Sequence, residues 1–277
     1  MAEQEQTLSL QKALELAVEH QKAGRFAEAK NVYQQILEAN PDQFDALHLL
    51  GVVAYQMGKN ELAVDRITKA LAIQPDLAEG HNNLGLVLQA LEKPQEAIAS
   101  YQKALALKPD YAEPHYNLGV TLQKLGKLDD ALASHQKALD IRPDYAEAHF
   151  NVGNLFQELG KLDDATNSYR RALAIKPDFV EAHNNLGGTL QGVGKLEEAA
   201  SSFREALTIQ PGYTEAHNNL GVALQGLGRL EEAATSYQTA HPPPARLRRR
   251  ELQLGRCAQR NGEAGGSRCQ LPKRTRH

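Results

Sequence analysis

One pattern of residues recurs every 34 positions along most of the chain. Its repeats, numbered 1 to 7 here, begin at equally spaced residues: Leu10, Phe44, Ala78, Ala112, Ala146, Val180 and Thr214. A segment this short cannot bury an apolar face alone, so a fixed period of this size requires the repeats to stack on one another. The period predicts a linear array over residues 10–241 and argues against a single globular core.

Repeat 5 shows what each repeat contains. Apolar residues lie at helical spacing on both sides of Gly160, and Pro177 ends the second stretch. Proline lacks the backbone N–H that a continuing helix would need. Each repeat is therefore predicted to be a pair of amphipathic helices, and the chain is predicted to be all-α.

Four positions within the repeat carry landmarks. Position 8 is glycine in repeats 2 to 7, position 20 is alanine throughout, position 24 is mostly Tyr or Phe, and position 32 is proline in repeats 1 to 6. At position 8 a missing side chain would let the paired helix approach closely. The pattern resembles the tetratricopeptide repeat (TPR) over residues 10–240. This resemblance implies an α-α solenoid wound as a right-handed superhelix.

The charge of the chain is unevenly distributed. The whole chain has 31 Lys+Arg and 34 Asp+Glu, but residues 242–277 hold 10 and 2 of these, which leaves 21 and 32 before them. An acidic array argues against nucleic acid as a ligand, because phosphate contacts need clustered Lys and Arg. No segment is apolar enough to span a membrane, and the first residues do not resemble a secretory signal, so we expect a cytoplasmic protein without a membrane partner.

Acidic residues and glycines mark the predicted ends of helices. In the interior repeats an aspartate follows the proline and a glutamate comes three residues later, as in Asp144 and Glu147, which predicts a capping box. Position 15, between the two helices, is glycine except for Glu92, which is followed by Pro94. If this turn needs a positive φ, Glu92 costs about 1 kcal/mol there. Residues 1–9 are predicted to be a polar, frayed lead-in.

The basic tail, residues 242–277, departs abruptly from the repeat. From Arg246 onward, permitted codons read one base later give DYADVNYNLGAAL and then KEMGKLEEAVASYQNALAI. This is a repeat in phase with the others, with Gly at positions 8 and 15, Ala at 20 and 27 and Tyr at 24. We therefore interpret the tail as disordered and as an out-of-frame translation of a further repeat. The alternative is that its arginine run is a nuclear-import or nucleic-acid patch.

No residues in the repeats suggest catalysis or a bound metal. Histidines recur at position 4, but equivalent positions of stacked repeats are on the order of 10 Å apart, too far to share one ion. Gly194 and Lys195 lack the other residues of a phosphate loop, and no nucleophile and base recur together. We predict a chain that is not an enzyme and needs no cofactor or metal.

The predicted binding surface is the face of the first helix that lines the concave groove in TPR arrays. Asparagine recurs at position 6 and glutamine at position 12, and both can donate to and accept from an extended peptide backbone. The candidate peptide-binding residues are Asn83, Asn117, Asn151, Asn185, Asn219, Gln89, Gln123, Gln157, Gln191, Gln225, Tyr116 and Phe150. The alternative, weighed equally, is that these amides bond to neighbouring repeats and hold the array together.

Two functional hypotheses follow. The first is a non-catalytic scaffold that binds a protein or peptide in the groove. The second comes from the segments EAHNNLG at 181–187 and 215–221, which resemble the arrays of O-linked N-acetylglucosamine transferases. That resemblance implies the substrate-recruiting part of a glycosyltransferase whose catalytic domain is missing. The uncapped last repeat is also expected to self-associate through Leu220, Leu224 and Tyr237.

Overall fold

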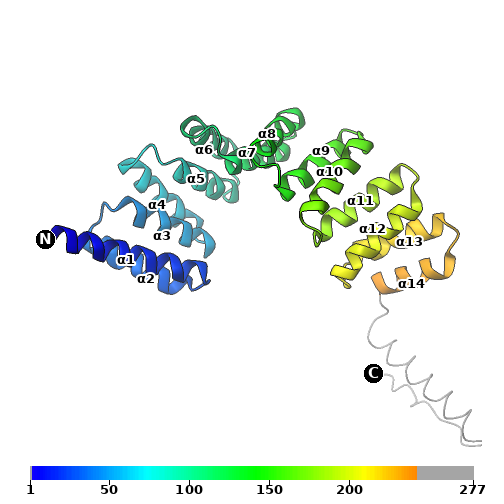
Figure 1. The fold of residues 1–277 in the computed structure, drawn as a ribbon, viewed down its shortest axis with the longest axis horizontal. Coiled ribbons are helices and arrows are strands. Elements are labelled where there is room, and N and C mark those ends of the chain that lie inside the picture. Colours follow the sequence, from blue (N-terminus) through cyan, green and yellow to red (C-terminus); the bar gives the residue numbers. More distant parts are fainter. Residues whose placement is uncertain (1, 242–277) are drawn as a thin grey trace, which may run out of the picture. The chain divides into compact units, whose positions relative to one another are not determined.

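The computed structural model describes the backbone of residues 2–241 and the side chains of residues 10–241. All regular secondary structure in this part of the chain is α-helical, as predicted (Figure 1). The chain divides into two compact units, an N-terminal unit that ends at Pro177 and a C-terminal unit that begins at Asp178. The predicted basic, out-of-frame tail at residues 242–277 lies outside the described residues.

Repeats 1 to 5 form the N-terminal unit. Its helices are α1 (Ala2–Lys22), α2 (Phe26–Ala39), α3 (Phe44–Gln56), α4 (Asn60–Ile73), α5 (Ala78–Ala90), α6 (Pro94–Leu107), α7 (Ala112–Lys124), α8 (Leu128–Ile141), α9 (Ala146–Glu158) and α10 (Leu162–Ile175). Each odd-numbered helix packs against the even-numbered helices before and after it. Figure 1 shows these helices as successive antiparallel pairs. The predicted α-α solenoid is therefore confirmed.

Repeats 6 and 7 form the described part of the C-terminal unit. Its helices are α11 (Val180–Gly192), α12 (Leu196–Ile209), α13 (Thr214–Gly226) and α14 (Leu230–Ala240). They pack in the same order, α11 on α12, α12 on α13 and α13 on α14. From repeat 2 onward, every first helix begins at the first residue of the repeat as predicted from the period.

Position 8 brings the two helices of a repeat together, as predicted. A Cβ atom on Gly153 would lie 2.6 Å from Cε1 of Tyr169, and one on Gly187 would lie 2.6 Å from Cε1 of Phe203. Real Cβ atoms do not approach other atoms this closely, so a side chain at Gly153 or Gly187 would displace the ring at position 24. The rings of Tyr169 and Phe203 are consequently fully buried.

Two predictions about helix ends were wrong. Helix α1 begins at Ala2, so residues 2–9 are helical and not frayed, which is consistent with the good helix formers Ala, Glu, Gln and Leu in this stretch. The capping box is also absent: Tyr145, not Asp144, is the N-cap of α9, and it makes no side-chain capping bond. The turn after the proline, closed by Tyr145 N–H donating to the carbonyl of Arg142, places the aspartate one residue too early to cap.

The turn inside repeat 3 has the conformation that the sequence suggested. Glu92 has φ 58°, and the glycines at the equivalent position have φ from 72° to 79°. Pro94 occupies the first turn of α6. This backbone conformation is unfavourable for a residue with a side chain, so Glu92 is locally strained.

The last described repeat does not expose the residues that were expected. Leu220 is 6 % and Leu224 is 1 % exposed, because both face the inside of the helix pair as their counterparts in repeat 6 do. The exposed apolar side chains are instead Val222, at 45 %, and Leu230, at 64 %. Self-association through Leu220 and Leu224 is therefore wrong as stated, and only Tyr237 of the expected set is partly exposed.

Candidate functional site

A ladder of side-chain hydrogen bonds joins the first helices of neighbouring repeats. In the N-terminal unit, Nδ2 of Asn117 donates to Oδ1 of Asn82 at 3.0 Å, and Nδ2 of Asn151 donates to the hydroxyl of Tyr116 at 3.2 Å. In the C-terminal unit, Nδ2 of Asn219 donates to Oδ1 of Asn184 at 3.1 Å. Position 6 of one repeat thus bonds to position 5 of the repeat before it. The structural alternative for these asparagines is correct at these rungs.

The same ladder begins at His48, where it also defines a tautomer. Nδ2 of Asn83 lies 2.9 Å from Nε2 of His48, and burial lowers the pKa of this histidine. The ring is therefore neutral at pH 7, and because an amide nitrogen only donates, Nε2 accepts and Nδ1 carries the proton. Sequence analysis did not identify position 5 as the acceptor of the ladder.

The ladder does not use all the hydrogen-bonding groups of these amides. Each side-chain amide has two N–H donors and an oxygen with two acceptor sites. The ladder takes one donor from each of Asn83, Asn117 and Asn151, and no other described side chain bonds to their amide groups. All three are half-buried. One N–H and the Oδ1 of each therefore remain for a ligand on this face.

The glutamines at position 12 are held by the second helix of their own repeat. Oε1 of Gln89 accepts from the hydroxyl of Tyr101 at 3.1 Å, and Oε1 of Gln157 accepts from that of Tyr169 at 2.9 Å. Gln225 is held in the same way by Tyr237 at 3.2 Å. Because the oxygen is fixed in Gln89 and Gln225, the NH₂ group is the part of these two side chains that remains for other contacts.

Two repeats lack the tyrosine, and their glutamines behave differently. In repeat 4 the ring at position 24 is His135, and Gln123 instead donates through Nε2 to Glu158 at 2.8 Å. In repeat 6 the ring is Phe203, and Oε1 of Gln191 is buried without a hydrogen-bond partner. Both ring nitrogens of His135 are also buried without partners, and burial lowers its pKa to about 4. The candidate glutamines are thus not chemically equivalent.

Aromatic side chains adjoin the asparagines of repeats 4 and 5. The Tyr116 ring lies 4.8 Å from that of Tyr145 and 5.4 Å from that of His135, and Phe150 lies 5.8 Å from Tyr169, between ring centroids. Burial raises the pKa of Tyr116, so its hydroxyl stays protonated near neutral pH and can donate while it accepts from Asn151. Tyr116 and Phe150 therefore form an apolar border beside the amides.

The histidines at position 4 have a structural role. Nε2 of His149 lies 2.9 Å from the carbonyl oxygen of Pro143. Nε2 of His81 lies 2.8 Å from the carbonyl oxygen of Pro75. A carbonyl oxygen only accepts, so Nε2 is the protonated nitrogen. The bond ties the start of each first helix to the preceding proline turn.

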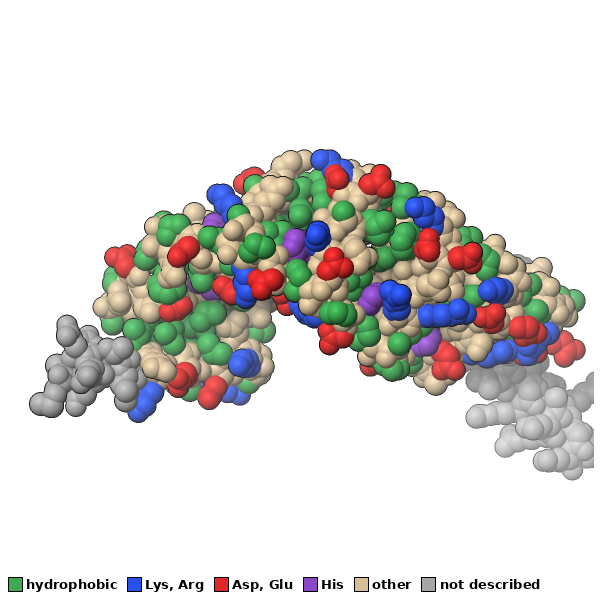
Figure 2. All heavy atoms as spheres, turned by 45° about the horizontal axis from the view of Figure 1, so that its top comes forward, with side chains coloured by type: hydrophobic (Ala, Val, Ile, Leu, Met, Phe, Trp, Pro, Cys, Tyr) green, Lys and Arg blue, Asp and Glu red, His purple; other side chains and the backbone are tan. Residues whose placement is uncertain are grey.

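Ion pairs close individual repeats, and sequence analysis missed them. Glu113 pairs with Arg142, and Glu147 lies 3.4 Å from Lys176. The signal was present as an acid at position 2 and a base at position 31 of the same repeat. Acidic and basic side chains are intermingled on the face shown in Figure 2.

Neither a metal site nor a membrane span is found in the part of the chain that the structure describes. Within residues 2–241, no three His, Cys, Asp or Glu side chains form a group that could hold a metal ion. No helix in the same range has the length and apolar character needed to cross a membrane.

Comparison with known proteins identifies the repeats. TPR family models match residues 13–43, 42–110, 76–144, 110–178, 150–214 and 190–242. No curated protein matches the chain.

Among solved structures, MamA is 27 % identical, with a TM-score of 0.55 and coverage of 58 % of this chain and 95 % of MamA. YrrB, described as a TPR protein with an unusual peptide-binding site, is 25 % identical, with a TM-score of 0.54 and coverage of 66 % and 95 %. PilF of Pseudomonas aeruginosa, 21 % identical over 76 % of this chain and 97 % of its own with a TM-score of 0.66, shares the fold. These neighbours give no support to the predicted likeness to O-linked N-acetylglucosamine transferases.

Proposed function

The chain belongs to the tetratricopeptide repeat family, and we propose that it is a non-catalytic scaffold that binds an extended segment of a partner protein. The proposed site in the N-terminal unit is the first-helix face around Asn83, Asn117 and Asn151, bordered by Tyr116 and Phe150. In the C-terminal unit the corresponding residues are Asn185, Asn219, Gln191 and Gln225.

One observation carries the proposal. Asn83, Asn117 and Asn151 are half-buried, occur once per repeat, and each keeps an N–H and an oxygen that the ladder does not use. A polar group that is partly withdrawn from water gains most from a partner that satisfies it. An extended peptide presents backbone N–H and C=O groups at regular intervals, so it matches a row of amides better than a folded surface does.

The known relatives are consistent with this chemistry. YrrB is described as having an unusual peptide-binding site, and its structure aligns with 66 % of the present chain. Within the face itself, the aromatic border would contact side chains of the peptide, while the amides bond to its backbone. Such a site would select peptides mainly by their extended shape and only weakly by sequence.

The test separates contact with peptide from support of the array. Peptides that bind the purified chain would be selected from an immobilised library, and their affinity measured by fluorescence anisotropy. Replacing Asn117 and Asn151 with Ala removes two amide groups, each worth about 0.5–1.5 kcal/mol as a hydrogen bond, so affinity should fall about tenfold. Unchanged affinity would refute the proposed site.

The matched control is Asn82→Ala. Asn82 is 4 % exposed and accepts the ladder bond from Asn117, so its loss breaks the same rung without removing an amide from the proposed site. Peptide affinity should change little in this variant if Asn117 contacts the ligand. An equal loss in both variants would mean that the ladder acts only by holding the array. N-methylation of the peptide backbone should weaken binding if main-chain groups are read.

A further inference from the structure

The last described repeat presents an incomplete stacking face. This face consists of Val222, Leu230, Ala234 and Tyr237, at positions 9, 17, 21 and 24 of repeat 7. Val222, Leu230 and Ala234 are exposed and Tyr237 is half-buried. At position 24 the corresponding rings of repeats 1, 3, 5 and 6 are 0 % exposed. Among the residues that the structure describes, repeat 7 therefore has no counterpart of the cover that repeat 6 receives from repeat 7.

The structure shows what normally covers these positions. Leu196, at position 17 of repeat 6, touches repeat 7: its Cδ1 would lie 2.8 Å from a Cβ atom on Gly226. Leu128, at the same position in repeat 4, packs against a cluster that includes Leu155 of repeat 5. Leu128 and Leu196 thus contact the first helix of the next repeat, whereas no described helix follows repeat 7 to contact Leu230.

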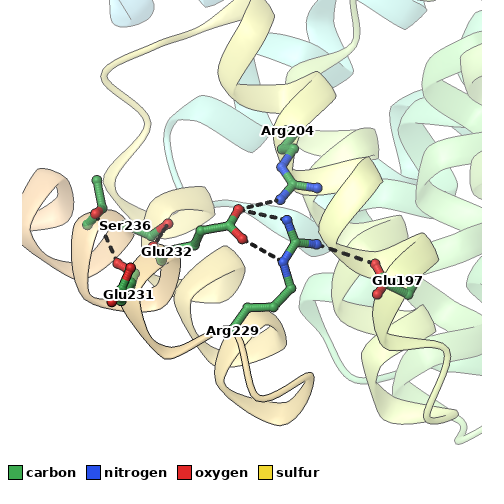
Figure 3. Close-up of polar contacts among 7 residues, drawn as sticks. Glu197, Arg204, Arg229, Glu231, Glu232 and Ser236 are labelled. Atoms are coloured by element: carbon green, nitrogen blue, oxygen red, sulfur yellow. Dashed lines mark hydrogen bonds and ion pairs between the residues drawn. The ribbon is translucent and has the colours of Figure 1, made fainter.

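Repeat 7 is itself firmly attached to repeat 6. Arg229 donates two hydrogen bonds of 2.7 Å to Glu232 and lies 3.6 Å from Glu197 of α12, while Arg204 of α12 lies 3.4 Å from Glu232 (Figure 3). The bond to Arg229 also lowers the pKa of Glu232. These pairs fix the start of α14, so the exposed face belongs to a well-placed helix pair.

We infer that this face is completed by an eighth repeat, which the gene encodes one base out of the frame that produces residues 242–277. If Ala245 to Leu247 are encoded by GCC CGA CTA, which the genetic code permits, that frame reads CCC GAC, and the recovered repeat begins with Ala preceded by Pro-Asp-Tyr. The chain already has this sequence at the same place in the repeat, at 109–112 and at 143–146.

The recovered sequence supplies the contacts that repeat 7 lacks. Its asparagine at position 6 would donate to Asn218, as Asn219 donates to Asn184 and Asn117 to Asn82. Its glutamate at position 13 occupies the same place in the repeat as Glu158 does in repeat 5. Its second helix, KLEEAVASYQNALAI, repeats the pattern of residues 195–209, KLEEAASSFREALTI. One difference is asparagine at position 4, where most repeats have histidine.

The first experiment is to sequence the source gene across codons 235–277. A single base gained or lost near codon 241 is expected, and an intact frame would overturn the inference. The second experiment compares two purified proteins, the chain as it stands and a chain in which residues 242–277 are replaced by the shifted-frame sequence. Both are unfolded in urea and followed by far-UV circular dichroism.

Leu230→Ala is then introduced into both proteins, with Leu196→Ala as the matched control. Leu196→Ala should lower the urea midpoint in both, because its contact with Gly226 is present in both. Leu230→Ala should leave the present chain nearly unchanged and lower the midpoint of the shifted-frame chain as much as Leu196→Ala does. An equally small effect of Leu230→Ala in both proteins would overturn the inference.

The competing occupant of the face is a second copy of the chain. Sedimentation of the present chain at increasing concentration tests this, with Leu230→Lys as the variant that should disrupt the contact. A dimer that forms through Leu230 and persists in the shifted-frame chain would show that the face pairs with another copy, and would contradict the inference. Loss of any such dimer in the shifted-frame chain would support it.

Discussion

Replacing Glu92 with glycine should stabilise the array. Glu92 adopts φ 58° at a turn where the other repeats have glycine. A left-handed conformation costs a residue with a Cβ atom about 1–2 kcal/mol relative to glycine. The substitution also lowers the free energy of unfolding by about 0.4–1 kcal/mol, because glycine has more conformational freedom in the unfolded chain. The net gain is therefore about 0.5–1 kcal/mol.

The structure indicates that this gain comes from the backbone alone. At the equivalent glycines, among them Gly58 and Gly126, an added Cβ atom would meet nothing within 4 Å. The side chain of Glu92 is therefore penalised for its φ and not for a collision. Its negative charge near the C-terminus of α5 adds a smaller unfavourable interaction with the helix dipole.

The assay is urea unfolding followed by circular dichroism. With a slope of about 3 kcal/mol per molar urea, a gain of 0.5–1 kcal/mol raises the midpoint by about 0.2–0.3 M. Glu92→Ala is the control, because it removes the charge but keeps the Cβ atom. Glycine should be more stable than alanine by most of the predicted amount. Equal midpoints for the two variants, or a lower midpoint for glycine, would refute the strain argument.

Three other substitutions, with Gly188→Ala as a control, test the packing of position 24 and position 8. Phe203→Tyr should raise the free energy of unfolding by about 1 kcal/mol, since a hydroxyl there can donate to the buried, unpaired Oε1 of Gln191. His135 has a pKa of about 4 in the folded chain and about 6.5 when unfolded. Its contribution to the free energy of unfolding is therefore fully present above pH 6.5 and is lost as the pH falls toward 4. At pH 5 the loss should be about 2 kcal/mol, and His135→Tyr should remove it from the measured pH profile. Gly187→Ala should destabilise by about 1–3 kcal/mol through its contact with Phe203, whereas Gly188→Ala, next to it and free of contacts, should stabilise by about 0.5–1 kcal/mol. Urea midpoints check each of these values.

Each of these predictions has a result that would contradict it. An unchanged or lower midpoint for Phe203→Tyr would mean that the new hydroxyl does not reach the glutamine. A pH profile that stays the same in His135→Tyr would assign the acid sensitivity to other groups. Similar midpoints for the two alanine variants of α11 would show that the close approach at position 8 is easily relieved.

The period in the sequence predicted the fold almost completely, because it encodes both helix boundaries and contacts. A proline at position 32 and a glycine at position 15 end the helices by removing a donor and by allowing positive φ, and both effects are local. The small residue at position 8 likewise predicted the close approach of the paired helix. Even the exception at Glu92 was visible as a residue that does not suit its turn.

The errors arose where local preference and tertiary context disagree. Asp144 is a good capping residue, but the proline turn places Tyr145 at the start of the helix instead. Leu220 and Leu224 were expected to be exposed because the last repeat has no described neighbour, although both lie between the helices of their own repeat. Exposure at the end of an array depends on which face each position occupies, and here the exposed positions are those of Val222 and Leu230.

The candidate site was harder to derive, because an amide has more hydrogen-bonding groups than one role requires. The asparagines serve the ladder and still have groups to spare, so structure and binding were never exclusive alternatives. The glutamines show how the fold can determine whether a side-chain amide presents its N–H groups or its oxygen. Tyr101 holds the oxygen of Gln89, which leaves the NH₂ group of Gln89 as a donor.

Gln123 has the opposite polarity, because no hydroxyl is present at position 24 of its repeat and its NH₂ group is used by Glu158. Under the proposed function, a peptide along this face would meet a donor at Gln89 and an acceptor at Gln123. A backbone that alternates between C=O and N–H can satisfy this order only in certain registers. His135→Tyr would turn Gln123 to match its neighbours, and it should therefore shift the preferred register of bound peptides without removing an amide from the site.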